Sequence, residues 1–144
     1  MMKTLDSEVL VSDGGRMPGR VRVCLPYTGS ALSVNHCYVN IGHGRKRYKR
    51  EVEAWMQLAC LEIKSALNEA HWKPSMADTP LRVKVTGHWK DARSACDGSN
   101  LAKVVLDTLQ RTLGINDKYM LWEDGEASFG NNPAWLEITL EAAK

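Results

Sequence analysis

The order in which apolar residues change their spacing along the chain is the feature that most constrains its fold. Residues 20–26 (RVRVCLP) and 81–89 (LRVKVTGHW) alternate with a period of two, which predicts two half-buried strands. Residues 48–70 and 99–113 instead repeat apolar side chains at steps of three and four, which predicts two amphipathic helices. Because a strand pattern and a helix pattern follow each other twice, the chain is expected to combine both kinds of element around one core.

The last part of the chain adds two strand patterns. Residues 119–130 and 134–142 carry aromatic and apolar side chains between polar ones, and residues 130–133 have the composition of a turn. These features predict a hairpin, with Trp122 and Trp135 packing across it. The full order of strand, helix, strand, helix, strand, strand predicts an α+β fold, in which one mixed sheet of about four strands carries two helices on one face.

A length of 144 residues is enough for one hydrophobic core and too short for two ordinary domains. We therefore expect one domain over residues 20–144. Residues 1–19 are polar and contain several glycines, which predicts a flexible N-terminal arm with a short strand at residues 8–11.

The spacing of the cysteines and the hydropathy of the chain are informative about its cellular location. The four cysteines are scattered without a CxxC pair, which predicts free thiols rather than a zinc site or a disulfide framework. No apolar run is long enough to cross a bilayer, and the N-terminal segment lacks the apolar stretch of a signal peptide. These features predict a cytoplasmic protein with no membrane partner.

The segment CDGSNLAKVVLDTL, which opens the second predicted helix, is the main candidate for chemistry. On a helix that begins near residue 99, Asn100, Lys103 and Asp107 share one polar face because they are three and four residues apart. Asp97 precedes this face, and Asp117 follows the helix in the turn GIND. A fold that packs both ends of the helix against neighbouring strands can bring these two carboxylates together.

The same residues also fit a purely structural interpretation. Serine, aspartate and asparagine are favoured in turns and at helix N-termini, where their side-chain oxygens accept hydrogen bonds from free backbone N–H groups. In this interpretation Ser99 is a helix N-cap, and Lys103 and Asp107 form an exposed pair one helical turn apart.

The ordered spacing of the whole segment DGSNLAKVVLDTLQRTLGIND resembles the signature of the RusA family of Holliday junction resolvases. That signature runs Asp-x-Asp-Asn-Leu-x-Lys, continues as a helix with an internal Asp, and ends in a turn with an Asp-Asp pair. By this resemblance Asp97 is the first signature acid, Asn100 and Lys103 are the signature asparagine and lysine, and Asp117 is the second acid of the later pair. The flanking LPYTGSALSVNHCYVN resembles the N-terminal loop of the family and places Asn35 among the DNA-binding candidates.

The resemblance implies a RusA-like nuclease domain that acts as a homodimer in DNA recombination and repair. Such an enzyme is a Mg²⁺-dependent endodeoxyribonuclease, in which Mn²⁺ can replace Mg²⁺, and it cuts four-way DNA junctions symmetrically. Asp97, Asp117, Lys103 and Asn100 are the implied catalytic residues. Of these, Asp97 and Asp117 are the implied metal ligands.

Two departures from the signature reduce the negative charge of the site. Ser99 stands where the family has its second acid, and Asn116 stands where it has the first acid of the later pair. Ser99 remains a candidate metal ligand through its neutral hydroxyl oxygen, and Asp107, Glu123 or Asp124 are alternatives that would complete the site. The alternative function is therefore a RusA-like protein that binds branched DNA but cleaves it weakly or not at all.

The segment RKRYKR supplies the remaining DNA-binding candidates, at the point where a long loop, residues 27–44, enters the first predicted helix. They are Arg45, Lys46, Arg47, Lys49 and Arg50. Such a cluster binds polyanions by neutralising phosphates and releasing their counterions. Positive charge at a helix N-terminus opposes the helix dipole, so helix stability does not explain the cluster.

Two structural explanations that need no nucleic acid remain for this basic segment. It can be a solvated junction between loop and helix, and Tyr48 can pack against the helix instead of stacking on an unpaired base. A third possibility for the whole chain is a generic nucleic-acid-binding domain with a coincidental turn motif.

Overall fold

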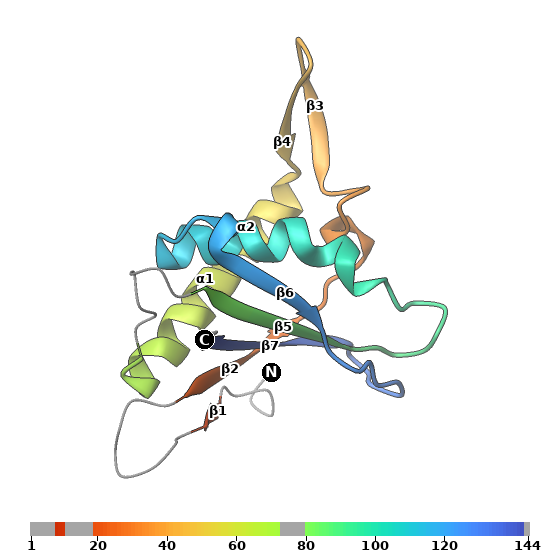
Figure 1. The fold of residues 1–144 in the computed structure, drawn as a ribbon. Helices are drawn as coiled ribbons and strands as arrows, with labels where there is room; N and C mark the ends of the chain where they lie inside the picture. The colour runs from red at the N-terminus through yellow and green to blue at the C-terminus, as the bar shows by residue number, and fades with distance from the viewer. Residues whose placement is uncertain (1–7, 11–18, 73–79, 143–144) are drawn as a thin grey trace.

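The computed structural model describes residues 8–10, 19–72 and 80–142 (Figure 1). The helices in these ranges are α1 (Arg50–Ala70) and α2 (Ala102–Leu113), with the short 3-10 helices η2 (Ser30–Leu32), η3 (Gly98–Leu101) and η4 (Asp117–Tyr119). The strands are β1 (Glu8–Leu10), β2 (Arg20–Pro26), β3 (Tyr38–Gly42), β4 (Arg45–Tyr48), β5 (Leu81–His88), β6 (Met120–Asp124) and β7 (Trp135–Ala142).

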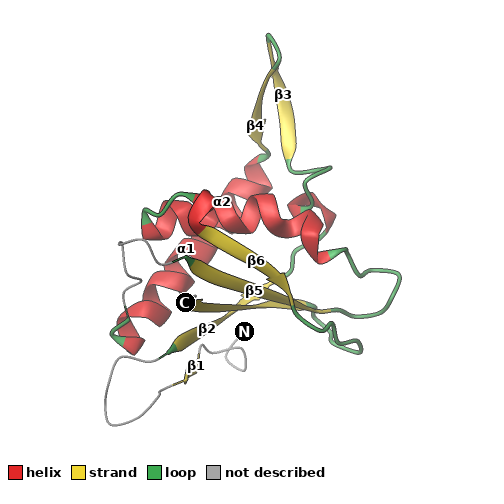
Figure 2. Cartoon of the chain, in the orientation of Figure 1, coloured by secondary structure: helices red, strands yellow, loops and turns green. Residues whose placement is uncertain are grey.

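The main sheet has five strands in the order β1-β2-β7-β5-β6. β7 pairs antiparallel with both β2 and β5, whereas β5 and β6 run parallel. Both helices cover one face of this sheet (Figure 2). The predicted α+β fold, with one mixed sheet and two helices on one face, is therefore confirmed. The sheet has one strand more than the predicted four, namely β1. It pairs with β2 at the sheet edge and confirms the short strand predicted there. The rest of the predicted flexible arm, apart from Gly19, lies outside the described residues.

The predicted hairpin between the last two strands is wrong. β6 pairs with β5, and β7 lies between β2 and β5, because residues 125–134 form a connection too long for a tight turn. Trp122 lies opposite Val83 in the register of β6 and β5. Trp135 instead stacks on His88, with ring centroids 3.9 Å apart. The two tryptophans therefore do not pack across a hairpin.

The core lies between the inner face of the sheet and the two helices. Trp55 of α1 donates a hydrogen bond from its Nε1 to the carbonyl of Pro26 at 2.8 Å, which ties the helix to the end of β2. Fully burying an aliphatic side chain such as Val52, Met56 or Ile63 contributes about 1.5–3 kcal/mol to the free energy of folding. The buried side chains of α1 recur at three- and four-residue steps, which confirms the predicted apolar stripe: Val52, Trp55, Met56, Ala59, Ile63, Ala66 and Ala70.

The helix starts differ from the prediction, whereas the end of α2 agrees with it. α1 begins at Arg50 because Tyr48 belongs to β4 and Lys49 has the extended backbone of a helix N-cap. α2 begins at Ala102 because η3 precedes it. It ends at Leu113 and is followed by its C-cap Gly114, whose left-handed φ of 72° suits glycine. Within the described ranges, no helix is both long and apolar enough to cross a bilayer.

A separate two-stranded hairpin, β3–β4, replaces the last part of the predicted loop, residues 38–44, and extends into the basic segment. It projects from the body beyond the helices (Figures 1 and 2). Its turn runs through Gly42, His43 and Gly44, all with positive φ, a backbone that glycine adopts readily. The sequence pattern missed this hairpin because β3 is exposed along most of its length and so has no alternation of buried and exposed residues.

Candidate nucleic-acid interface and acidic site

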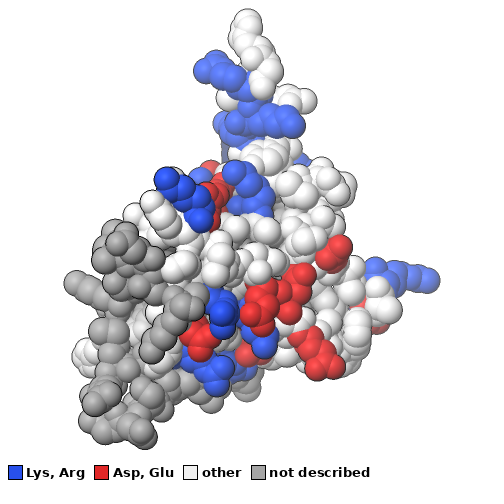
Figure 3. Space-filling model, viewed as in Figure 1, with Lys and Arg blue, Asp and Glu red and all other residues white. Residues whose placement is uncertain are grey.

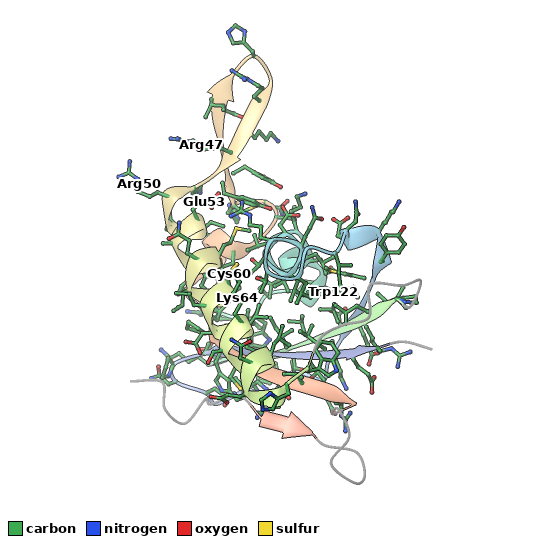
Figure 4. All side chains as sticks on the ribbon, turned by 90° about the vertical axis from the view of Figure 1, so that its left-hand side faces the viewer. Arg47, Arg50, Glu53, Cys60, Lys64 and Trp122 are labelled. Carbon is green, nitrogen blue, oxygen red and sulfur yellow. The ribbon has the colours of Figure 1, made fainter. Side chains whose placement is uncertain are left out.

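The projecting hairpin carries the predicted basic residues. Arg45, Lys46 and Arg47 are exposed along β4, Arg50 is exposed at the start of α1, and Lys49 is half-buried between them. Figure 3 shows Lys and Arg side chains gathered on the hairpin, while acidic side chains lie on the body below it. In Figure 4, Arg47 and Arg50 point to the same side of the hairpin. The predicted basic residues are therefore exposed apart from the half-buried Lys49, and they lie on a strand and a helix start rather than on a loop.

Two tyrosines pack at the base of this hairpin. The rings of Tyr38 and Tyr48 stack with centroids 4.8 Å apart and planes 16° from parallel. The hydroxyl of Tyr48 donates a hydrogen bond to the carboxylate of Asp107 on α2. Burial, together with this hydrogen bond, raises the pKa of Tyr48 far above its ordinary value. Tyr48 therefore packs against the helix, and it anchors the hairpin to α2.

Lys103 and Asp107 lie together on the polar face of α2, as the spacing predicts. The Lys103 Nζ is 3.4 Å from Asp107 Oδ2, and the lysine side chain is 45% exposed. Partial burial acts to lower the pKa of Lys103, but the electrostatic interactions with Asp107, Tyr38 and Asp117 and a hydrogen bond to Asp107 outweigh it and raise that pKa. The ammonium group is therefore firmly charged at neutral pH, and it lies within electrostatic range of two aspartates.

Asp97, and not Ser99, caps the turn that leads into α2. Its carboxylate accepts a hydrogen bond from the backbone N–H of Ser99 at 3.3 Å. The predicted N-cap role of Ser99 is wrong because the chain forms η3 first, which moves the cap two residues earlier. The carbonyl of Asn100 accepts a hydrogen bond from Val34 N–H at 2.8 Å, which holds the segment with the exposed Asn35 against the start of α2.

An acid from a different element lies beside this turn. The carboxylate of Asp124, at the end of β6, occupies the space over Gly98, where an added Cβ atom would lie 2.4 Å from Asp124 Oδ1. Trp122, labelled in Figure 4, donates a hydrogen bond from its Nε1 to the same oxygen at 2.9 Å. A side chain at position 98 would therefore push the Asp124 carboxylate away from this turn. Asp124 is only one of several alternatives in the sequence, because its position beside Gly98 depends on the parallel pairing of β6 with β5.

Asp117 begins η4, beyond the C-terminal end of α2. Its backbone N–H donates a hydrogen bond to Gln110 Oε1 at 3.2 Å, which holds the later turn against the helix. Asn116, the residue in place of a signature acid, caps η4 by accepting a hydrogen bond from Lys118 N–H at 3.0 Å. The later turn therefore lies close enough for the charge of Asp117 to act on Lys103.

The acids of the site offer oxygen ligands of the type that Mg²⁺ and Mn²⁺ prefer. The Asp124 carboxylate lies over Gly98, next to Asp97, and Asp117 contributes to the raised pKa of Lys103. No group of three or more His, Cys, Asp or Glu side chains is arranged to hold a metal ion in the part of the chain that the structure describes.

A second polar network, which the sequence pattern did not indicate, lies on the sheet face away from the helices. His88 Nδ1 is 2.6 Å from Ser128 Oγ, and His88 Nε2 is 2.8 Å from Glu137 Oε1. Arg22 Nε donates a hydrogen bond to Glu137 Oε2 at 2.8 Å. Burial acts to raise the pKa of Glu137, but the hydrogen bonds from His88 and Arg22 outweigh it and lower that pKa. The network ties the connection between β6 and β7 to the strands β5, β7 and β2.

Comparison with models of known protein families gives no match to this chain, and comparison with curated proteins gives none. The resemblance to the RusA family therefore rests on the motif residues themselves.

Proposed function

We propose that this chain is a RusA-like endodeoxyribonuclease that binds four-way DNA junctions as a homodimer and cuts them in the presence of Mg²⁺ or Mn²⁺. The observation that carries the proposal is the basic β3–β4 hairpin, which projects beside α2 and is joined to its polar face through Tyr48 and Asp107. A DNA backbone bound along the hairpin would lie next to Lys103 and the acids around it. The setting we propose is the cytoplasm of a bacterial or phage-infected cell.

Binding follows from the charge of the hairpin. The guanidinium and ammonium groups of Arg45, Lys46, Arg47 and Arg50 would neutralise phosphates and release their counterions, which makes affinity strongly dependent on salt. Phosphate contacts of this kind carry no sequence information, so recognition would depend on DNA shape. A four-way junction has twofold symmetry, and a homodimer would present two hairpins and two acidic sites in matching positions.

A divalent cation would supply the chemistry of phosphodiester hydrolysis, since it polarises the scissile phosphate and lowers the pKa of an attacking water. Asp97 and Asp117 would hold it, as the resemblance implies, with Ser99 as a neutral oxygen donor. Asp124, one of the alternative acids, has its carboxylate over Gly98 and would be a further ligand on the side of Asp97. Carboxylates fit a hard cation, so the donor chemistry of the site agrees with the cation implied by the resemblance.

Lys103 and Asn100 would act on the substrate rather than on the cation. The charged Lys103 would stabilise negative charge that develops on the phosphate, and its ion pair with Asp107 at 3.4 Å would hold it in place. Asn100, whose backbone is fixed by Val34, would orient a water molecule or a neighbouring carboxylate.

A second candidate function is a branched-DNA-binding protein with weak or no cleavage. It is favoured by Ser99 in place of an acid and by the finding that the described residues contain no ready group of three metal-binding side chains. In this case the hairpin would be fully functional and the acids around Gly98 would serve only the local fold.

The test is cleavage of a synthetic four-way junction with Mg²⁺ or Mn²⁺, with binding measured in parallel. The assay compares the natural chain with two variants, Asp117→Asn and Ser99→Asp. The matched control is Glu62→Gln, which changes an exposed acid on α1. We expect cleavage by the natural chain, a loss of about 100-fold or more in Asp117→Asn, and unchanged binding in all variants. If only Ser99→Asp cleaves while every variant binds, the second candidate replaces the first.

A further inference from the structure

Two apolar side chains stand exposed on the basic hairpin. Val39 is 38% exposed and Ile41 is 45% exposed, both on β3. The hairpin forms its own two-stranded sheet and pairs with no strand of the main sheet. A projecting hairpin of this kind does not bury these side chains in the chain's own core, so core packing does not explain why they are apolar.

The backbone of the hairpin presents these residues close to its tip. Val39 lies opposite the exposed Arg47 of β4. The register shifts between Asn40 and Gly42, so Ile41 has no partner on β4 and is the extra residue of a bulge. Bulges redirect a side chain and increase the local twist, and they often occur where a strand meets a ligand. The turn of Gly42, His43 and Gly44 then closes the hairpin within three residues.

Charge indicates what kind of partner would cover this apolar pair. Residues 27–50 contain no acidic side chain, and the strand opposite Val39 and Ile41 is basic. An apolar tip among cations matches the chemistry of a nucleic acid with accessible base faces, because phosphates pair with the cations while bases accept apolar contacts. Intact duplex stacks its bases and hides those faces, whereas a branch point exposes them.

We propose that Val39 and Ile41 form a wedge that inserts between bases at the branch point of a DNA junction, while the cations of β4 hold the flanking phosphates. The inference rests on the proposed function only in taking branched DNA as the ligand, and it does not require cleavage. Apolar wedges of this kind unstack a base step and bend the DNA, which gives a preference for structure without reading sequence.

The experiment uses the full chain and junctions that carry 2-aminopurine either at the branch point or within a duplex arm, without divalent metal. The test variant is the double change Val39→Thr and Ile41→Thr, because threonine keeps the β-branched shape and strand preference. The matched control is Arg45→Gln with Arg47→Gln, which removes charge and keeps the apolar pair. Circular dichroism of all proteins verifies the fold.

With the natural chain, we expect fluorescence at the branch point to rise severalfold and fluorescence in the duplex arm to stay unchanged. The threonine variant should lose most of this rise and about tenfold in junction affinity, with less than about a twofold change for duplex. The glutamine variant should lose affinity for both DNAs.

Several results would overturn the wedge. One is a branch-point signal and a junction preference that survive the threonine changes. Another is binding to anionic phospholipid vesicles that needs Val39 and Ile41, with no branch-point signal. A natural chain that binds neither DNA overturns the wedge and the proposed function together, whereas junction binding with the expected signal but no cleavage in metal overturns the nuclease alone.

Discussion

The sheet body and the projecting hairpin use similar apolar residues in opposite ways. In β7 of the body, Leu136 is completely buried, whereas Val39 and Ile41 of β3 are exposed by more than a third. β7 has hydrogen-bonded partners on both sides, while β3 has only β4. The difference indicates that the body supplies the stability of the fold and that the hairpin is free to present its side chains to a ligand.

The two regions meet at a small set of contacts. The Tyr48 hydroxyl donates to Asp107 of α2, which attaches the hairpin to the body at its base. The Lys49 N–H donates to the Cys37 carbonyl and so closes the two ends of the hairpin against each other. A rigid base would let the hairpin hold DNA at a defined position relative to Lys103.

The largest expected effect is on stability and compares the two regions directly. Leu136→Ala should lower the free energy of unfolding by about 2–5 kcal/mol, because it leaves a cavity at a completely buried position. Ile41→Ala should lower it by less than about 0.5 kcal/mol, as for other surface changes. Urea unfolding of both variants measures this. An equal decrease in the free energy of unfolding in both variants would mean that the hairpin is part of the cooperative core rather than a separate projection.

A smaller effect is expected where the regions join. Tyr48→Phe removes the donor to Asp107 and should lower the free energy of unfolding by about 1 kcal/mol, because Lys103 still pairs with that carboxylate. Hydrogen exchange of the Lys49 amide should become faster. The control is Tyr119→Phe, which changes an exposed tyrosine. An unchanged Lys49 exchange rate in Tyr48→Phe would show that the tyrosine does not anchor the hairpin.

The smallest effect concerns pH and belongs to the body alone. Since His88 and Arg22 lower the pKa of Glu137, the folded state binds this proton more weakly than the unfolded state. The resulting stability is present above the unfolded pKa of glutamate and is lost as pH falls through the lower folded pKa. Its size should be about 0.5–1 kcal/mol, because the pair is partly exposed.

Urea unfolding as a function of acidic pH tests this assignment. Glu137→Gln should remove that part of the pH dependence, and Glu141→Gln, at a more exposed acid paired with Arg82, should keep it. Junction affinity at neutral pH should be the same in both variants. Loss of DNA binding in Glu137→Gln would connect the body network to the hairpin and so weaken the separation of the two regions.

The candidate site was only partly predictable. The spacing of Lys103 and Asp107 placed them correctly on one helical face, because helix geometry is local. The cap was assigned to Ser99 and is Asp97, because one turn of 3-10 helix before α2 is not encoded in the apolar spacing. Asp124 entered only as one of several alternatives, since its approach to Gly98 depends on the pairing of two distant strands.

Apolar spacing alone predicts the main elements of the body and the fold class, because strands and helices that bury one face repeat their apolar residues with the period of their backbone. The pairing of the strands comes from the folded structure, which places β7 between β2 and β5 and β6 parallel to β5, since a strand pattern does not specify its partners. The folded structure also shows that the basic segment belongs to a projecting hairpin. An exposed strand has no buried face, so no period in the sequence marks it.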